Sequence, residues 1–316
     1  MIEETFNDAY DQEGITRAAD NALSPLKDYY DYYEKIVDQN KITDKSLNWR
    51  HIKDSIQIIN ECGFKSHRSL FLRLFIEYNS KKDDEGKIAT NELEHLRKMI
   101  QLVESYIVRR TIVQDLPSNS VETLFIEMSK KNKDNVLLTE ESIRKKLLEQ
   151  DGRGIWPSDE KVREALSCKD LYGSSREKFC YFLLERICAY ELDNYTERIS
   201  DSQPTCEHIF PQKPGEWQPF YSKEDFDYLR DHMHRIGNLT PLTRPKNSDA
   251  NNNPYCYKLK TYAESQYQLT KEIGEKYGEQ WTRETYMRRQ EDLIGYVLEI
   301  WKKDDKGNAS NKKDIS

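Results

Sequence analysis

Three features are missing from this chain of 316 residues, and each absence excludes a class of protein. No apolar run approaches the roughly 20 residues that a helix needs to cross a bilayer. The first 20 residues are acidic and polar, unlike a signal peptide. The six cysteines are scattered and form no Cys-x-x-Cys pair, so we expect no structural zinc site and a reducing compartment. We therefore predict a cytoplasmic protein without a membrane partner.

The sequence also lacks the glycine patterns of nucleotide-binding folds. The segment Gly152-Arg153-Gly154 has no preceding strand pattern and no third glycine, and we find no phosphate loop, parallel βαβ rhythm or repeat. The net charge is −7. Because contacts to phosphate need lysine and arginine, this charge argues against indiscriminate DNA binding.

What the sequence does contain is a series of amphipathic helical patterns. Charged residues make up 33% and hydrophobic residues 36%, which is typical of a strongly solvated helical protein. Apolar residues between 93 and 107 recur at spacings of three and four, which predicts a core seam. The pattern also predicts a helix over 174–191 with Tyr190 facing inward. Helix caps are predicted at six hydroxyl residues, namely Ser24, Ser66, Thr90, Ser158, Ser222 and Thr282. The expected fold class is mainly α.

The length of the chain suits two domains rather than one. A polar, lysine-rich run at 130–135 marks the predicted boundary. We expect a helical bundle with a positioning or regulatory role in residues 1–134, and a second, functional domain in residues 135–303. Residues 304–316 are polar and are predicted to be a disordered tail.

Two short apolar runs in the second half carry polar residues suited to catalysis. Glu207 and His208 begin a run that Pro211 ends, which indicates a strand with its chemistry at the edge. A second run, 237–242, carries Asn238. Glu207 and His208 are adjacent, so they would point to opposite faces unless the strand ends there.

A polar segment and a helical stretch follow the second run. The polar segment contains Asn247 and the asparagine run 251–253, and the helical stretch contains Lys258 and Tyr262. The order strand, strand, helix predicts a ββα motif embedded in a helical domain. Such a motif, with a carboxylate, an imidazole and a carboxamide along it, suits a phosphodiesterase that uses one metal ion.

The residue types match the needs of phosphodiester hydrolysis. Glu207 and Asn247 offer oxygen ligands, which suit one Mg²⁺ or Mn²⁺ ion better than Zn²⁺, although Asn251 is an alternative ligand. His208 suits the role of general base, because a neutral imidazole can take a proton from water at neutral pH. Asn238 is expected to bridge the two strand ends. Lys258 is expected to steady a phosphate, with a plain salt bridge as the alternative.

The segment 235–260 holds five basic residues and one acidic residue. A local positive charge of this kind is where a DNA backbone would lie. On charge alone, ordinary surface charge explains the pattern equally well. The candidate DNA-binding residues are Arg235, Arg244, Lys246 and Lys260.

These residues also carry a family resemblance. The second half of the chain resembles the HNH (ββα-metal) nuclease domain of GmrSD-type modification-dependent restriction enzymes. The resemblance rests on E-H-I-F-P-Q at 207–212, H-R-I-G-N-L-T-P-L at 234–242, Asn247, and K-x-x-x-Y-x-x-S at 258–265. These enzymes are related to phosphorothioate-sensing SspE-like proteins. A weaker likeness runs from about residue 139 to 289. A helix that ends in two arginines, at 109 and 110, is similar to the helical middle domain of these enzymes.

The resemblance implies roles for individual residues. His208 would be the general base, Glu207 and Asn247 the metal ligands, and Asn238 the structural asparagine in the middle of the motif. Asn247 follows Asn238 by 9 positions, as in HNH nucleases, whereas Asn238 follows His208 by 30 because of an insert at 213–233.

The resemblance further implies a DNA endonuclease module of a prokaryotic anti-phage system, with double-stranded DNA, modified or of phage origin, as its partner. The NTP-using sensor domain of such enzymes, with its D-G-Q-Q-R motif, has no counterpart in this sequence. We therefore expect the chain to be a fragment, or to act with a separate sensor protein. Two alternatives stay open: an inactive HNH scaffold that binds nucleic acid or a partner protein, and an HNH RNase toxin.

Overall fold

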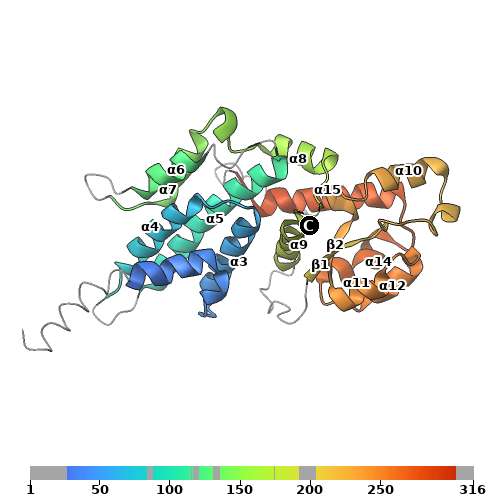
Figure 1. Ribbon diagram of the computed structural model, residues 1–316, viewed down its shortest axis with the longest axis horizontal. Coiled ribbons are helices and arrows are strands. Elements are labelled where there is room, and N and C mark those ends of the chain that lie inside the picture. Colours follow the sequence, from blue (N-terminus) through green and yellow to red (C-terminus); the bar gives the residue numbers. More distant parts are fainter. Residues whose placement is uncertain are drawn as a thin grey trace, which may run out of the picture. The chain divides into compact units, whose positions relative to one another are not determined.

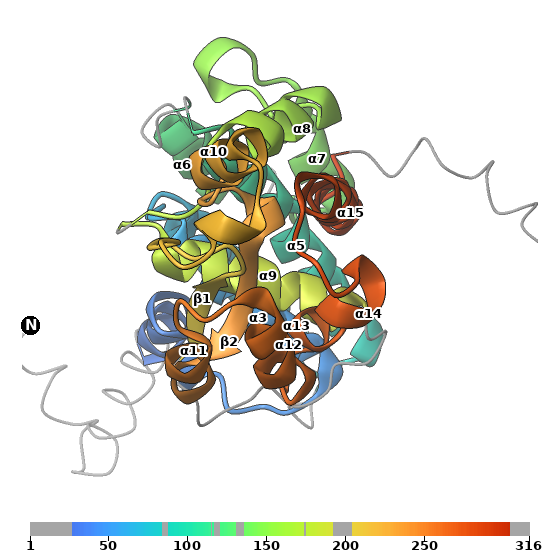
Figure 2. The ribbon, with the colours of Figure 1, turned by 90° about the vertical axis from the view of Figure 1, so that its right-hand side faces the viewer.

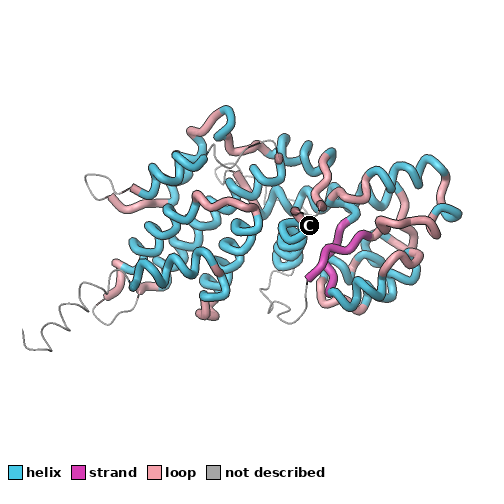
Figure 3. Tube along the Cα trace, viewed as in Figure 1, coloured by secondary structure: helices cyan, strands magenta, loops and turns pink. Residues whose placement is uncertain are grey.

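The protein is mainly helical, as predicted. The computed structural model describes residues 27–83, 88–114, 116, 121–130, 136–173, 175–191 and 204–303. Within these ranges the strands form one two-stranded sheet among helices (Figure 3). The predicted tail, 304–316, lies outside the described residues. No helix in the described part of the chain combines the length and apolarity that a membrane span requires.

The chain divides into two compact units. The first comprises Met1–Asn60, Lys65–Leu102 and Ser118–Lys145, and the second comprises Glu61–Phe64, Val103–Pro117 and Lys146–Ser316. One long helix, α5 (Thr90–Val113), contributes residues to both units. Residues 131–135, which belong to the lysine-rich run behind the predicted boundary, lie outside the described residues.

The first unit is built from helices around an aliphatic and aromatic core. Ile56, Leu74 and Phe75 are buried, and so are Leu96 and Ile100 on the predicted seam of α5. Residues 27–37 are helical. The other elements that contribute to this unit are η1 (Gln39–Lys41), α3 (Leu47–Glu61), α4 (His67–Asn79), α6 (Glu122–Ser129) and α7 (Glu140–Leu148).

A buried arginine connects α4 to the segment between α6 and α7. The Nε of Arg73 donates to Glu77 at 2.6 Å on the same helix. Its other nitrogens donate to the carbonyl oxygens of Met128 and Val136, each at 2.9 Å. Charge-assisted hydrogen bonds of this kind are strong, so Arg73 fixes α6 against α4, which Figure 1 shows side by side.

The second unit places two antiparallel strands against helices. In β1 (Pro204–His208) and β2 (Leu239–Thr243), Glu207 pairs with Thr240 and His208 with Leu239. Helices α9 and α11 contact β1, and α13 contacts β2 (Figure 2). The other elements of this unit are η3 (Gly152–Gly154), α8 (Asp159–Cys168), α9 (Glu177–Glu191), η4 (Gln218–Phe220), α10 (Lys223–Asp231), η5 (Ile236–Asn238), α11 (Arg244–Ala250), α12 (Tyr255–Ala263), α13 (Gln268–Lys271), α14 (Ile273–Tyr277) and α15 (Arg283–Ile300).

The polar segment after β2 is itself helical. Thr243 precedes α11 and Pro245 lies in its first turn, where proline has no hydrogen bond to lose. Asn247 is therefore presented by a helix rather than by a loop.

Hydroxyl residues predicted the starts of several helices. The hydroxyl groups of Ser158, Ser222 and Thr282 accept backbone N–H bonds at the starts of α8, α10 and α15, as expected. The predicted cap at Ser66 is wrong, because its side chain makes no cap bond. Thr90 is the first residue of α5 rather than the cap before it, and Ser24 lies outside the described residues. The inward orientation of Tyr190 is also wrong, since that residue is 45% exposed near the end of α9.

The core of the first unit contains an imidazole with no polar partner. His67 opens α4, is fully buried and meets the ring of Phe71 edge-on at 5.0 Å between centroids. Neither ring nitrogen has a hydrogen-bond partner among the described residues. Burial, and then the charge of Arg68, lower the pKa of His67 to about 3.

We expect His67→Leu to make the free energy of unfolding less sensitive to acid. The unfolded wild-type chain binds a proton at this imidazole near its ordinary pKa of 6.5, whereas the folded chain resists protonation until about pH 3. Wild-type stability therefore falls as the pH drops through this window, by about 2 kcal/mol at pH 5, and the variant should lack that loss. Urea unfolding at pH 7 and pH 5 measures it, with the exposed position His95→Leu as control. An equal loss in His67→Leu and wild type would contradict the expectation.

Candidate active site

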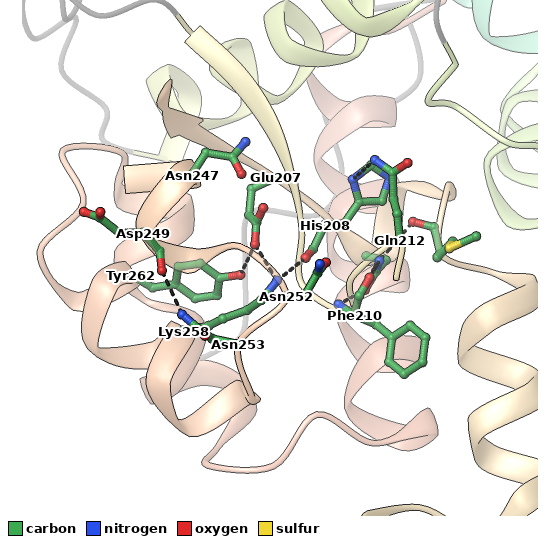
Figure 4. Close-up of polar contacts among 12 residues, drawn as sticks. Glu207, His208, Phe210, Gln212, Asn247, Asp249, Asn252, Asn253, Lys258 and Tyr262 are labelled. Carbon is green, nitrogen blue, oxygen red and sulfur yellow. Dashed lines mark hydrogen bonds and ion pairs between the residues drawn. The ribbon is translucent and has the colours of Figure 1, made fainter. Parts of the chain in front are cut away.

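Four of the predicted site residues line one pocket in the second unit. Glu207 and His208 reach it from β1, and Asn247 reaches it from α11. The pocket has a volume of about 370 Å³ and is open to solvent. Figure 4 shows the side-chain amide of Asn247 next to the carboxylate of Glu207. Arg244, also predicted, lines the same pocket.

The end of β1 allows two adjacent residues to serve one pocket. Neighbouring side chains of a regular strand point to opposite faces. Here the strand ends at His208, and the chain turns away before the buried Pro211. The pocket therefore receives both Glu207 and His208.

A buried cation holds Glu207. The ammonium of Lys258 on α12 donates to Oε1 of Glu207 at 2.7 Å, and the hydroxyl of Tyr262 donates to the same oxygen at 2.9 Å. Burial raises the pKa of Glu207 and lowers the pKa of Lys258, while the attraction between the two charges opposes both shifts. Loss of hydration thus disfavours the charged forms of both residues, and each charge is stabilised by the opposite charge of its partner.

Lys258 lies behind the pocket rather than in it. Its side chain has no exposed surface, and it is not among the residues that line the pocket. Besides Glu207, its ammonium donates to the backbone carbonyl of His208 at 2.7 Å. We therefore assign Lys258 to positioning two neighbouring residues of β1. Its ion pair with Glu207 is the alternative predicted from the sequence, and it replaces the expected phosphate contact.

The imidazole of His208 is hydrogen-bonded at both nitrogens. Nε2 lies 3.0 Å from Nδ1 of His234. The side-chain nitrogen of Gln212 lies 3.2 Å from Nδ1 of His208 (Figure 4). Burial, followed by the nearby His234 and the Lys258 charge, lowers the pKa of His208 to about 3. The ring is therefore neutral at physiological pH, which is the form that can accept a proton.

Asn238 joins the loop after β1 to the end of the insert. Its side-chain oxygen accepts the N–H of Phe210 at 2.8 Å. Its side-chain nitrogen donates to the carbonyl oxygens of Phe210 and Met233, each at 2.9 Å. Asn238 is buried, so these bonds bridge the two strand ends without contact with the pocket.

The remaining predicted residues differ in their access to the pocket. Asn247 donates from Nδ2 to the hydroxyl of Thr205 at 2.7 Å, so its amide is oriented by β1. Arg235 donates to the carbonyl oxygen of Ser167 at 2.8 Å and does not line the pocket.

The two predicted DNA-binding lysines lie outside the pocket lining. Lys246 forms an ion pair with Glu264 at the surface. Lys260 is exposed, with its ammonium 5.4 Å from the centre of the Tyr257 ring. A DNA-binding role for either residue stays a prediction, and Arg244 is the one basic candidate that lines the pocket.

Three residues at the site were not singled out from the sequence. His234 and Gln212 belong to the two motif stretches, so their places in H-R-I-G-N and E-H-I-F-P-Q were the available signals. Tyr172 comes from the connection between α8 and α9 and meets His208 edge-on at 4.6 Å between ring centroids. No local pattern around Tyr172 points to this contact.

The donors at the pocket fit a hydrated, oxygen-preferring cation. In the described part of the chain, no group of three or more histidine, cysteine, aspartate or glutamate residues is placed to hold a metal ion. A closed protein cage of such ligands is thus excluded for these residues. A carboxylate and a carboxamide at an open pocket suit Mg²⁺ or Mn²⁺, which keep several water ligands.

Residues 156–296 match the protein family described as "GmrSD restriction endonucleases, C-terminal domain". The matched segment contains every residue that lines the pocket. A comparison with curated proteins gives no match. The predicted resemblance to GmrSD-type restriction enzymes is confirmed for this segment.

We expect Lys258→Met to destabilise the protein strongly. Removing the ammonium leaves the buried carboxylate of Glu207 without its counter-charge, a change that costs about 3–5 kcal/mol. The free energy of unfolding from urea titration measures the effect. Lys246→Met removes an exposed pair and is the matched control, for which little change is expected.

The double variant Glu207→Gln/Lys258→Met completes this test. Because it removes both charges, its stability should exceed that of Lys258→Met alone. If Lys258→Met unfolds no more easily than Lys246→Met, the buried pair is not the constraint described above.

Proposed function

Because residues 156–296 match the C-terminal domain of GmrSD restriction endonucleases, we propose that this chain nicks or cleaves double-stranded DNA by metal-dependent, HNH-type hydrolysis. The observation that carries this proposal is the single pocket shared by Glu207, His208 and Asn247. These residues supply a carboxylate, a neutral imidazole and a carboxamide. Together they cover the groups that phosphodiester hydrolysis needs from a protein.

His208 acts as the general base in this proposal. A water oxygen attacks phosphorus, the bond from phosphorus to the 3′ oxygen breaks, and the water proton passes to Nδ1 of His208. Support comes from the neutral state of the imidazole and from its place on the pocket wall. Gln212, whose amide now occupies Nδ1 and which is exposed, yields that position to the water.

Glu207 and Asn247 hold one Mg²⁺ or Mn²⁺ ion in this proposal. When bound, such an ion supplies charge relief on the phosphoryl oxygens and stabilises the leaving oxygen. Lys258 already compensates the charge of Glu207, and Asn247 is neutral. The DNA phosphate must therefore provide much of the negative charge that retains the cation, which couples metal binding to substrate binding.

Arg244 is the basic residue best placed to contact the DNA backbone, because it is exposed and lines the pocket. We propose that Lys246, Lys260 and Arg235 add weaker, longer-range attraction. Contacts to phosphates position DNA without reading its sequence. We accordingly propose that the choice of modified or phage DNA belongs to an NTP-using sensor in another domain or protein, and that the system acts against phage in the prokaryotic cytoplasm.

We expect His208→Ala to lower plasmid cleavage by about 10²- to 10⁴-fold, because a general base contributes a factor of this order. The assay incubates supercoiled plasmid with purified protein and Mg²⁺ or Mn²⁺, and follows the nicked and linear forms. His95→Ala, a surface histidine of α5, is the matched control and should cut like the wild type.

The outcomes of this assay separate the candidate functions. Equal cutting by wild type and His208→Ala would sink the proposal and indicate a contaminating nuclease. Binding of plasmid without cutting would favour an inactive scaffold. Labelled RNA offered in parallel would be cut preferentially if the protein were an RNase.

We expect Asn247→Ala to raise the Mg²⁺ concentration for half-maximal cleavage by at least about tenfold, as losses around metal sites commonly do. Asn251 lines the same pocket and is the alternative ligand. Its φ is 41°, a conformation that glycine tolerates, so Asn251→Gly removes the side chain without backbone strain. Titration of both variants with Mg²⁺ decides whether Asn247 or Asn251 is the metal ligand. A larger shift for Asn251→Gly than for Asn247→Ala would transfer the ligand role to Asn251.

A further inference from the structure

The hydrogen bonds of His208 define where its proton lies. The amide nitrogen of Gln212 is a donor, so Nδ1 of His208 accepts from it. A neutral imidazole carries one hydrogen, which must then lie on Nε2 of His208. In that tautomer Nε2 donates to Nδ1 of His234, which lies 3.0 Å away.

Backbone hydrogen bonds and a ring contact position His234. Its backbone carbonyl accepts two consecutive N–H groups, from Leu171 at 2.9 Å and from Tyr172 at 3.0 Å. The ring of Tyr172 stacks on the ring of His234 with 15° between the planes and a centroid distance of 5.7 Å. The same tyrosine ring meets His208 edge-on. Three segments distant in the sequence thus enclose the pair of imidazoles.

We propose that His234 is a positioning residue that keeps the hydrogen of His208 on Nε2 and so leaves the lone pair of Nδ1 available to the pocket. This inference rests on the proposed role of His208 as general base. With the hydrogen on Nδ1 instead, His208 would offer no acceptor at the atom that Gln212 now contacts. His234 would act only through His208 and would not touch the DNA.

The tautomer of His208 can be observed directly. Two-bond ¹H–¹⁵N correlation spectra distinguish an imidazole with its hydrogen on Nε2 from one with its hydrogen on Nδ1, and His208→Ala assigns the signals. We expect the Nε2–H form in the wild type and in His234→Asn, whose side-chain oxygen stands where Nδ1 of His234 stood. His234→Leu offers no acceptor, so its His208 should shift toward the Nδ1–H form.

The rate of plasmid cleavage should fall when His208 leaves the Nε2–H form. We expect His234→Leu to cut plasmid roughly 10- to 100-fold more slowly than wild type, the order of effect of leaving a buried N–H unsatisfied. His234→Asn should retain most of the activity. His232→Leu, two positions away, removes a ring that donates to the backbone carbonyl of Tyr228 and is not in the pocket lining. It therefore controls for loss of a nearby imidazole.

The two measurements keep the inference separate from the proposed function. An unchanged His208 tautomer in His234→Leu would overturn the positioning role whether or not DNA is cut, and so would equally low cutting by His234→Asn and His234→Leu. If His208→Ala cuts plasmid like the wild type, the proposed function fails instead, while the spectra still report on the pair of imidazoles.

Discussion

The site depends on the buried ammonium of Lys258. Its two acceptors, the carboxylate of Glu207 and the carbonyl oxygen of His208, belong to consecutive residues of β1. A single cation on α12 therefore fixes both the side chain of one residue and the backbone of the next. Burial of the two charges opposes this arrangement, as the shifts in pKa of both partners show. What retains the pair is the still larger penalty for leaving either charge alone.

A second layer of contacts fixes the other strand. Arg289 on α15 is fully buried and donates to the carbonyl oxygens of Gly237 and Leu239, at 2.9 and 2.8 Å. Gly237 is required there, because a Cβ atom would lie 2.8 Å from Cβ of Gln290. This close approach of α15 sets the 3-10 turn that presents Asn238, which in turn holds Phe210. The loop after His208 is thus determined by a helix that lies far along the sequence.

The sequence predicted the types and the order of the site residues but not their connections. From the sequence we predicted that Glu207, His208 and Asn247 form one site, and all three line one pocket. Hydroxyl residues likewise predicted the starts of α8, α10 and α15. These signals are local. The pairing of Lys258 with Glu207 spans 51 positions, and Tyr172 reaches His208 from another element. Such contacts are fixed by packing, which one sequence does not display. For the same reason Lys258 was expected at a phosphate rather than behind the pocket.

The adjacency of Glu207 and His208 has a physical consequence for how the site is built. Because side chains alternate along a strand, a one-residue slip of β1 against β2 would move both residues away from their partners at once. The register is therefore held from several sides: by Lys258 on one residue, by His234 on the next, and by Asn238 at Phe210. The carboxylate and the imidazole are thereby positioned as one unit, which reduces the ordering that the proposed binding of DNA requires.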